Sequence, residues 1–181
     1  MPPHPLDFDD TTVTKHCSER EVAITLELSR IQSLRPYMIP ILSTTRDTIT
    51  MPRLYPRVLP PDQQVTDVDW LAMWTCLHEL HKAGYMHGSP HMGNFLLVDQ
   101  RCVMIDFEET RHLDDVPGRA NVQFDWFLFS EYFGASALCQ SFAALGVDWK
   151  AEDNRRTNAE IIALEEKLIN PALLWRWLFS S

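Results

Sequence analysis

The stretch that decides the fold is His87-Gly88-Ser89-Pro90-His91-Met92-Gly93-Asn94, followed by the apolar run Phe95-Leu96-Leu97 and, further on, by Val103-Met104-Ile105-Asp106-Phe107-Glu108. The first part combines two histidines, two glycines, a proline and an amide, a composition that is typical of a tight loop. The two apolar runs flank the polar turn Asp99-Gln100-Arg101 and predict a β-hairpin. The sequence therefore places a loop, a hairpin and the carboxylate of Asp106 in succession.

Helical patterns stand on both sides of this stretch. Ser18 and Glu21 form an S-x-x-E capping box, which predicts a helix from residue 18 to about residue 32. A second apolar periodicity predicts a helix over 67–82, ending before Gly84. Downstream, apolar patterns predict helices over 124–133 and 158–169, a short helix between Gly134 and Gly146, and a last helix from Pro171.

Apart from the hairpin, the strand signals lie at the beginning of the chain and are short. Residues 1–10 are rich in proline and aspartate, and we expect them to be irregular. The β-branched run at 11–15 predicts one strand, and two more are predicted at 38–43 and 47–51. Prolines 52, 56, 60 and 61 then predict a hinge. The predicted class is α+β, with a reduced β part over 1–61 and a mainly helical part over 62–181.

Composition narrows the functional classes. The formal net charge is −9 and the basic residues form no dense run, which argues against a nucleic-acid partner. No apolar run is long enough to span a bilayer or to resemble a signal peptide. The four cysteines contain no CxxC pair, so reduced thiols and a cytoplasmic location are expected, with no membrane partner.

The order of these elements resembles the protein-kinase-like fold over residues 18–133. The loop and hairpin are most similar to those of the aminoglycoside and choline phosphotransferases, whose pattern is H-G-D-x-H-x-x-N followed by I-D-F-E. Here the pattern is His87, Gly88, Ser89, His91 and Asn94, followed by Ile105-Asp106-Phe107-Glu108. The resemblance implies a kinase C-lobe-like helical domain with two or three short strands before it.

The resemblance also implies roles for single residues. Asn94 and Asp106 would hold a metal ion, and Glu21 would be the helix glutamate that pairs with a strand lysine. Asp125 would accept hydrogen bonds from the backbone of the catalytic loop, where His87 packs inward. Lys15 is the only lysine available to pair with Glu21, and the sequence leaves this pairing open.

The chain departs from the family pattern in three ways. Ser89 stands where the family has the aspartate that accepts the substrate proton, and loss of a general base typically costs about 10²–10⁴-fold in rate. No glycine precedes Gly84, so a glycine-rich phosphate loop is absent from the N-terminal part. About 17 residues precede the first predicted helix, which leaves room for one strand of a nucleotide-covering sheet.

These departures favour a pseudokinase-type binding or regulatory module that has lost ordinary ATP-dependent phosphotransfer. One alternative is an enzyme that reuses the cleft for acid–base chemistry on a small molecule, with His91 or Asp106 as the titrating group. Another is a residual small-molecule phosphotransferase.

The sequence leaves the cofactor open: Mg²⁺ is one candidate, which Asn94, Asp106 and Glu108 would hold, whereas the departures argue against ATP. The alternative is that Asn94 and Asp106 only stabilise the fold. The partner would be a small molecule or a protein. Because the strands at 38–43 and 47–51 would have open edges, a second copy of the chain is a further candidate.

Overall fold

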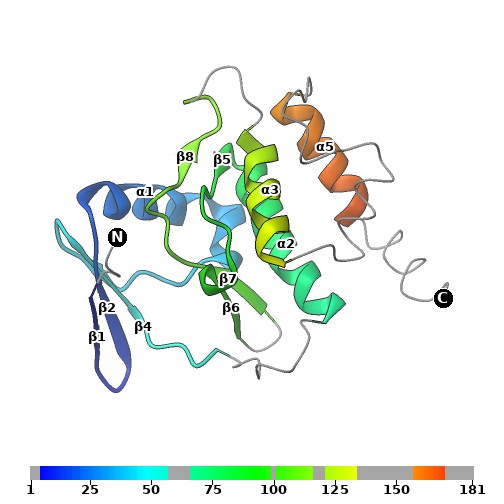
Figure 1. Cartoon of the computed structure of the whole chain (residues 1–181). Helices are drawn as coiled ribbons and strands as arrows, with labels where there is room; N and C mark the ends of the chain where they lie inside the picture. The colour runs from blue at the N-terminus through cyan, green and yellow to red at the C-terminus, as the bar shows by residue number, and fades with distance from the viewer. Residues whose placement is uncertain (1–4, 57–65, 99–100, 116–120, 134–156, 170–181) are drawn as a thin grey trace. The chain divides into compact units, whose positions relative to one another are not determined.

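The computed structural model describes residues 5–56, 66–98, 101–115, 121–133 and 157–169, and Figure 1 shows their helices and strands. Helices are combined with short antiparallel strands, which confirms the predicted α+β class. The chain divides into one unit of Met1–Cys76 with Gly93–Thr110 and another of Leu77–Met92 with Arg111–Ser181. The predicted division at residues 61 and 62 stays a prediction. Among the described helices, none is both long and apolar enough to cross a membrane.

The first unit contains a four-stranded antiparallel sheet in the order β1-β2-β4-β3. Its strands are β1 (Leu6–Phe8), β2 (Thr12–His16), β3 (Ser43–Thr44) and β4 (Thr48–Pro52). Thr14 lies opposite Thr50 in the register, and their hydroxyls are 3.1 Å apart. Within residues 5–18, which the structure describes, two strands precede the first helix, and this corrects the expectation of a single strand.

The turn between β1 and β2 explains why residues 1–10 are not irregular throughout, as the sequence had predicted. The Asp9 carboxylate accepts hydrogen bonds from the Thr11 and Thr12 backbone N–H groups, at 2.7 and 2.6 Å. It also accepts one from the Thr12 hydroxyl. An aspartate that bonds its own backbone in this way stabilises a turn without glycine, so a composition that indicated a loop produces a hairpin.

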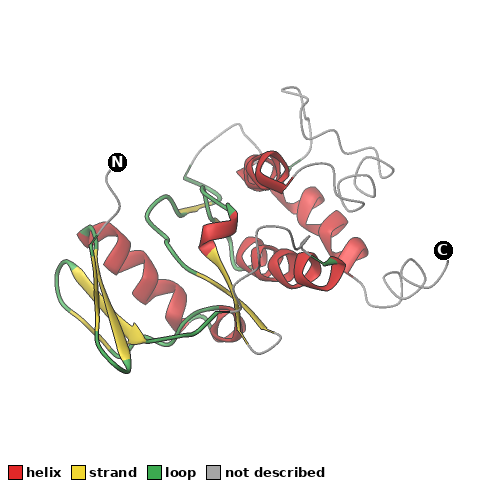
Figure 2. Cartoon of the chain, turned by 60° about the horizontal axis from the view of Figure 1, so that its bottom comes forward, coloured by secondary structure: helices red, strands yellow, loops and turns green. Residues whose placement is uncertain are grey.

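Helix α1 (Glu19–Arg30) packs on this sheet, and Figure 2 shows the helix in red beside the yellow strands. Val22 lies in a buried cluster with Cys17 and with Ile49 of β4, and Leu26 packs against that cluster. Ser18 caps the helix by accepting the Glu21 N–H at 3.1 Å, worth about 1 kcal/mol. The predicted start of the helix is thus confirmed.

The segment predicted as a strand at 38–43 has a different structure. A 3₁₀ helix, η1, occupies Gln32–Tyr37, and Met38 forms an isolated parallel bridge with Met104. Of this segment only Ser43 belongs to a strand, β3, which pairs with β4. Because β4 pairs with β2 on its other side, the expected open edge at 47–51 is wrong. The described edge strands of this sheet are β1 and β3.

The predicted hairpin is present in the first unit. It consists of β6 (Phe95–Val98) and β7 (Arg101–Met104), with Phe95 opposite Met104. The short 3₁₀ helix η2 (Met92–Asn94) precedes it. The Ile105 N–H donates to the Asn94 carbonyl at 3.0 Å, which holds the residue before Asp106 beside the start of the hairpin.

The second unit contains the end of α2 (Asp67–Lys82), with α3 (Asn121–Phe133) and α5 (Asn158–Ile169). Gly84, at φ +90°, follows α2 in the left-handed conformation expected of a helix-ending glycine. A pair of short strands, β5 (Tyr85–Met86) and β8 (Arg111–His112), was not predicted. The helices predicted after Gly134 and after Pro171, and the hinge prolines 60 and 61, lie outside the described residues.

Candidate functional site

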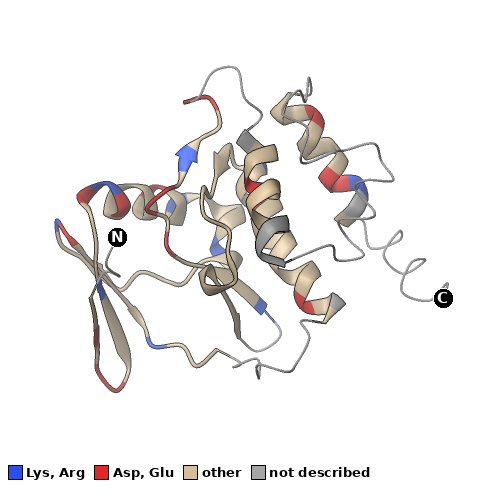
Figure 3. Cartoon of the chain, viewed as in Figure 1, with Lys and Arg blue, Asp and Glu red and all other residues tan. Residues whose placement is uncertain are grey.

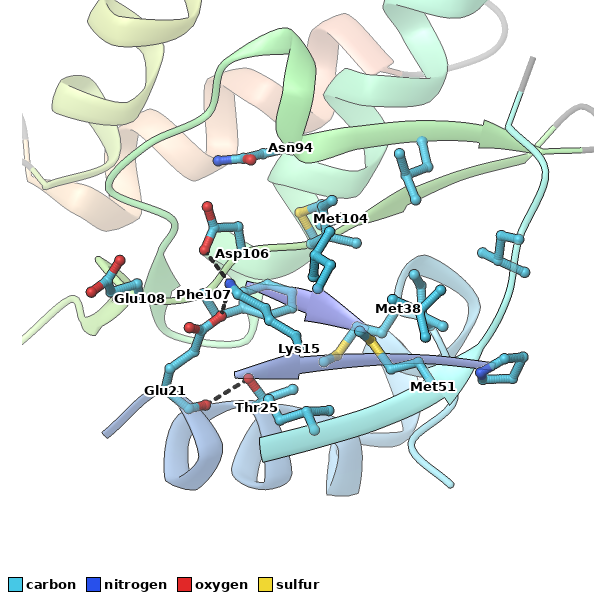
Figure 4. A pocket seen from close by; sticks show the side chains of 18 of the residues that line it. Lys15, Glu21, Thr25, Met38, Met51, Asn94, Met104, Asp106, Phe107 and Glu108 are labelled. Atoms are coloured by element: carbon cyan, nitrogen blue, oxygen red, sulfur yellow. Dashed lines mark hydrogen bonds and ion pairs between the residues drawn. The ribbon is translucent and has the colours of Figure 1, made fainter. Parts of the chain in front are cut away.

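One face of the four-stranded sheet covers a cavity of about 570 Å³ in the first unit. Side chains alternate along a strand, so Val13 and Lys15 of β2 point to the same face, with Ile49 and Met51 opposite them. Most of the lining is apolar, and the polar residues stand close together in Figure 4. The lining residues outside the sheet come from α1, the segment 38–39, the segment after β4, and the chain from Asn94 to Glu108.

Lys15 is the centre of the polar part of the cavity. Its ammonium donates to Glu21 Oε1 at 2.5 Å and to Asp106 Oδ1 at 2.6 Å, and Figure 4 shows both contacts. Glu21 is almost fully buried, whereas the Asp106 side chain is 39% exposed. The pairing of Lys15 with Glu21, which the sequence left open, is therefore formed. The contact of Lys15 with Asp106 joins residues that are 91 positions apart in the chain.

The carboxylates keep the lysine charged in this site. Burial disfavours the ammonium, but the hydrogen bonds and attraction of Asp106 and Glu21 outweigh it and raise the pKa of Lys15 above its usual value. The two carboxylates hold this cation in place. Because its side chain is 14% exposed, the cation also remains within reach of a ligand in the cavity. It is suited to bind an anionic group such as a phosphate.

The backbone at Asp106 has an unusual conformation. Its φ of +65° lies in the left-handed region, where it is the only non-glycine residue among those described. Aspartate adopts this region more readily than most residues, yet the conformation persists only where the surroundings fix it. The contact with Lys15 fixes the side chain, while Phe107 is buried immediately after it.

Asn94 and Glu108 also line the cavity, and Figure 4 shows Asn94 on the same side as Asp106. No group of three histidine, cysteine or acidic residues within the described parts could hold a metal ion by itself. Magnesium in proteins often has one or two carboxylates and completes its shell with water and ligand phosphates. The oxygens of Asn94 and Asp106 suit Mg²⁺ that arrives with a phosphorylated ligand, and Glu108 would add a third donor.

The remaining predicted site residues belong to the second unit. Asp125 of α3 accepts the backbone N–H groups of His87 and Gly88, at 2.5 and 2.7 Å. His87 is fully buried, and the Ser89 N–H points to its Nδ1 at 3.4 Å. The His91 N–H donates to the Ser89 carbonyl at 2.9 Å. Hydrogen bonds within the loop over residues 87–91, and those to the buried Asp125 carboxylate, therefore fix the conformation of this loop.

Sequence reasoning missed the side chains that support that carboxylate. His81 of α2 lies between Asp125 and Glu165, with ring nitrogens 3.1 and 2.9 Å from the two carboxylates. His78 contacts the second oxygen of Glu165 at 2.6 Å, and the Trp126 indole N–H also donates to Glu165. Two features of the sequence could have indicated this cluster: two histidines three positions apart on one predicted helix, and a glutamate on the apolar face of another.

Comparison with known proteins supports the fold. No protein-family model and no curated protein sequence matches the chain at a significant level. Solved structures of WbdD are similar to it. In a co-crystal structure of WbdD with the kinase inhibitor LY294002, the TM-score is 0.63 at 16% identity, over 93% of this chain and 44% of that one. A structure of WbdD as a bifunctional kinase-methyltransferase gives 0.54 at 16% identity, over 90% and 42%.

This likeness shows a kinase-like fold. A third structure, a high-resolution crystal structure of WbdD, agrees, with a TM-score of 0.59. The chain spans less than half the length of the WbdD chains it matches.

Proposed function

We propose that the chain is a kinase-like binding module whose cavity takes an adenosine-like ligand, and that it does not carry out ordinary ATP-dependent phosphotransfer. The observation that carries the first part is the Lys15 ammonium, held between Glu21 and Asp106 at one part of an otherwise apolar cavity. Such a cavity suits a ligand with a flat apolar body and a polar group.

The size of the cavity agrees with this ligand class. A volume of about 570 Å³ lies within the range of roughly 300–1,000 Å³ that is usual for small-molecule sites. Met51, Leu96 and Met104 supply apolar surface from three different strands. Methionine side chains adapt to a planar ring at little cost in conformational strain.

The second part rests on the sequence. Ser89 replaces the aspartate of the H-G-D-x-H-x-x-N pattern, and an unactivated hydroxyl is a poor general base. Without a glycine before Gly84, the N-terminal part lacks the side-chain-free loop whose backbone amides could converge on the phosphates. Binding and chemistry are therefore separable: the Lys15 arrangement favours the first, while the loop composition disfavours the second.

Charge decides which form of a nucleotide would bind. Lys15 is the only cation among the lining residues, and it stands with three carboxylates, those of Glu21, Asp106 and Glu108. Free ATP would meet a net negative site and be repelled, whereas Mg²⁺ would offset the repulsion through Asp106 and Asn94. An uncharged nucleoside would bind without regard to Mg²⁺.

The test is a thermal-shift series on the full chain with adenosine, LY294002, ADP and ATP, each with and without Mg²⁺. LY294002 is included because WbdD was crystallised with it. We expect adenosine and LY294002 each to raise Tm by the same amount with and without Mg²⁺. We expect ATP to raise Tm only with Mg²⁺. At a ligand concentration of 100 times Kd, the stabilisation would be about 2.7 kcal/mol.

Two variants separate the site from the rest of the surface. Asp106→Asn keeps the side-chain shape but removes the charge, so it should abolish the Mg²⁺-dependent ATP shift and leave the adenosine shift. Asp114→Asn changes an exposed aspartate that does not line the cavity and should behave as the wild type. If no ligand shifts Tm under any condition, the proposed function is wrong.

A residual phosphotransferase is the second candidate. The observation that favours it is again the contact of Lys15 with Asp106 at 2.6 Å, because electrostatic stabilisation of phosphates contributes much of this catalysis. Ser89→Asp should then raise turnover of ATP with an alcohol or amine acceptor by about 10²-fold or more. Absence of transfer in both proteins would exclude it. We do not propose Asp106 as a general base, because its carboxylate already accepts from Lys15.

A further inference from the structure

Helix α1 contacts the chain around Asp106 through two neighbouring residues. Glu21 is buried and reaches Lys15, which in turn holds the Asp106 carboxylate. The preceding residue, Arg20, points to a different side of the helix, because consecutive helical residues are about 100° apart. Its guanidinium donates to the Glu108 carbonyl at 2.5 Å and to the Thr110 carbonyl at 2.7 Å.

The two contacts of Arg20 fall on a short, tightly folded segment. The Thr110 N–H donates to the Phe107 carbonyl at 3.1 Å, and both of these side chains are buried. The segment begins at Asp106 with its φ of +65°, a backbone state that the surrounding contacts must maintain. Lys15 therefore holds the side chain of Asp106, and Arg20 holds the main chain of the residues that follow it, at Glu108 and Thr110.

The chemistry suits an arginine better than a lysine. A planar guanidinium can donate to two carbonyl oxygens at once, and a lysine ammonium lacks this fixed fork. Figure 3 shows charges of both signs together at the first turn of α1, where Glu19 pairs with Arg46. Arg20 thus lies among charges of both signs, and its own guanidinium is bonded to backbone oxygens of this segment.

We infer that Arg20 is a positioning residue that fixes the Asp106–Thr110 segment, so that the Asp106 carboxylate is presented to Lys15 and to a bound Mg²⁺. The position of α1 and the conformation of this segment are then coupled, since displacement of the helix would break the contacts of Arg20 and Glu21 together. The part of this inference that concerns Mg²⁺ rests on the proposed function, whereas the part that concerns the backbone does not.

The backbone arm of the test is hydrogen exchange of the free protein. Arg20→Ala should raise the exchange rate of the Thr110 amide about tenfold, because loss of charge-assisted hydrogen bonds lowers the cost of opening. Arg20→Lys should give a smaller increase, since an ammonium can replace only part of the fork. Arg46→Ala is the matched control: it removes another exposed arginine bonded to the first turn of α1 and should leave this amide unchanged.

The ligand arm compares affinities in Arg20→Ala with those of the wild type. Mg²⁺-ATP should bind about tenfold more weakly, while adenosine should stay within about twofold, because only the first ligand depends on Asp106. Equal weakening of both ligands would indicate a general structural role and overturn the assignment. Unchanged exchange of Thr110 in Arg20→Ala would overturn it as well, whatever the ligands do. If the wild type binds no nucleotide, the proposed function fails and the exchange experiment still decides the role of Arg20.

Discussion

Glu165→Gln is the substitution whose effect can be worked out most fully from the second unit. Glu165 is fully buried on α5 and contacts His78 and His81 of α2 through its two oxygens. His81 is fully buried between Glu165 and Asp125. Both ring nitrogens face carboxylate oxygens, and only the imidazolium form can donate from both. The geometry therefore indicates a buried histidine cation between two carboxylates.

The magnitude follows from the pKa of His81. Burial disfavours the cation, but the attraction of Glu165 and the hydrogen bond that His81 donates to Asp125 outweigh it and raise the pKa of His81 from 6.5 to about 9. At 1.36 kcal/mol per pKa unit, this corresponds to roughly 3 kcal/mol of stability. The same attraction lowers the pKa of Glu165 against the effect of burial. Removing one partner of a buried ion pair typically costs about 3–5 kcal/mol.

The sign of the pH dependence is fixed by the direction of the shift. Because the folded protein binds the proton more tightly than the unfolded chain, the stabilisation is complete below about pH 6.5. It decreases as the pH rises and is lost once the pH passes the folded pKa of about 9. With Glu165→Gln, one of the two negative partners is gone, so the pKa of His81 falls and the decrease with pH becomes shallower.

Urea denaturation at pH 6, 7, 8 and 9 measures this directly, with tryptophan fluorescence as the signal. We expect the variant to be about 3 kcal/mol less stable than the wild type at pH 6 and to approach it by pH 9. Glu166→Gln, at the exposed neighbouring position on α5, is the control and should follow the wild type throughout. A constant difference between the Glu165→Gln and wild-type curves at every pH would refute a charged His81.

Three further predictions concern the first unit. Ser18→Ala should lower the free energy of unfolding by about 1 kcal/mol in urea titrations, because it removes the N-cap of α1. Burial, together with the charge of Glu21, raises the pKa of Cys17 to about 11. This thiol should therefore react with a thiol reagent at pH 8 far more slowly than free cysteine does. A rate equal to that of free cysteine would contradict this prediction. The side-chain hydrogen bond from Thr12 and the backbone hydrogen bonds in the turn lower the pKa of Asp9 to about 2. The contribution of the charged Asp9 to stability should therefore be present above about pH 4 and lost towards pH 2. In an NMR titration of the Thr12 amide, Asp9→Asn should weaken this acid dependence.

Much of the helical architecture could be predicted because its signals are local. The cap at Ser18, the apolar periodicity over 67–82 and the glycine at position 84 each depend on a few adjacent residues, and the helices begin and end near the predicted positions. The strands were harder. Segment 38–43 has apolar and β-branched residues, yet Met38 bridges to Met104, far along the chain, and most of the segment forms no strand. Such long-range pairing leaves no local pattern to detect.

The candidate site shows a different limit. The spacing of Ser18 and Glu21 was interpreted as a capping box, in which the glutamate would bond the backbone of the cap. The serine does cap the helix, but the glutamate carboxylate contacts Lys15. The resemblance to kinases implied that alternative role for Glu21, whereas helix rules favoured the local one. The turn at Asp9 lets β1 pair with β2, and both strands contribute side chains to the cavity in which Lys15 lies.

Both units use the same charge pattern, a cation between two carboxylates, and exposure separates their roles. His81 and its partners Asp125 and Glu165 are all fully buried, so no ligand can replace a partner without unfolding that part of the chain. Lys15 has one partner that is as buried, Glu21, and one that is not, because the Asp106 side chain is 39% exposed. A lysine stays charged far above neutral pH, and an exposed partner can exchange Lys15 for a ligand or metal at little desolvation cost. The buried triad is therefore suited to fixing a loop, and the half-open one to binding.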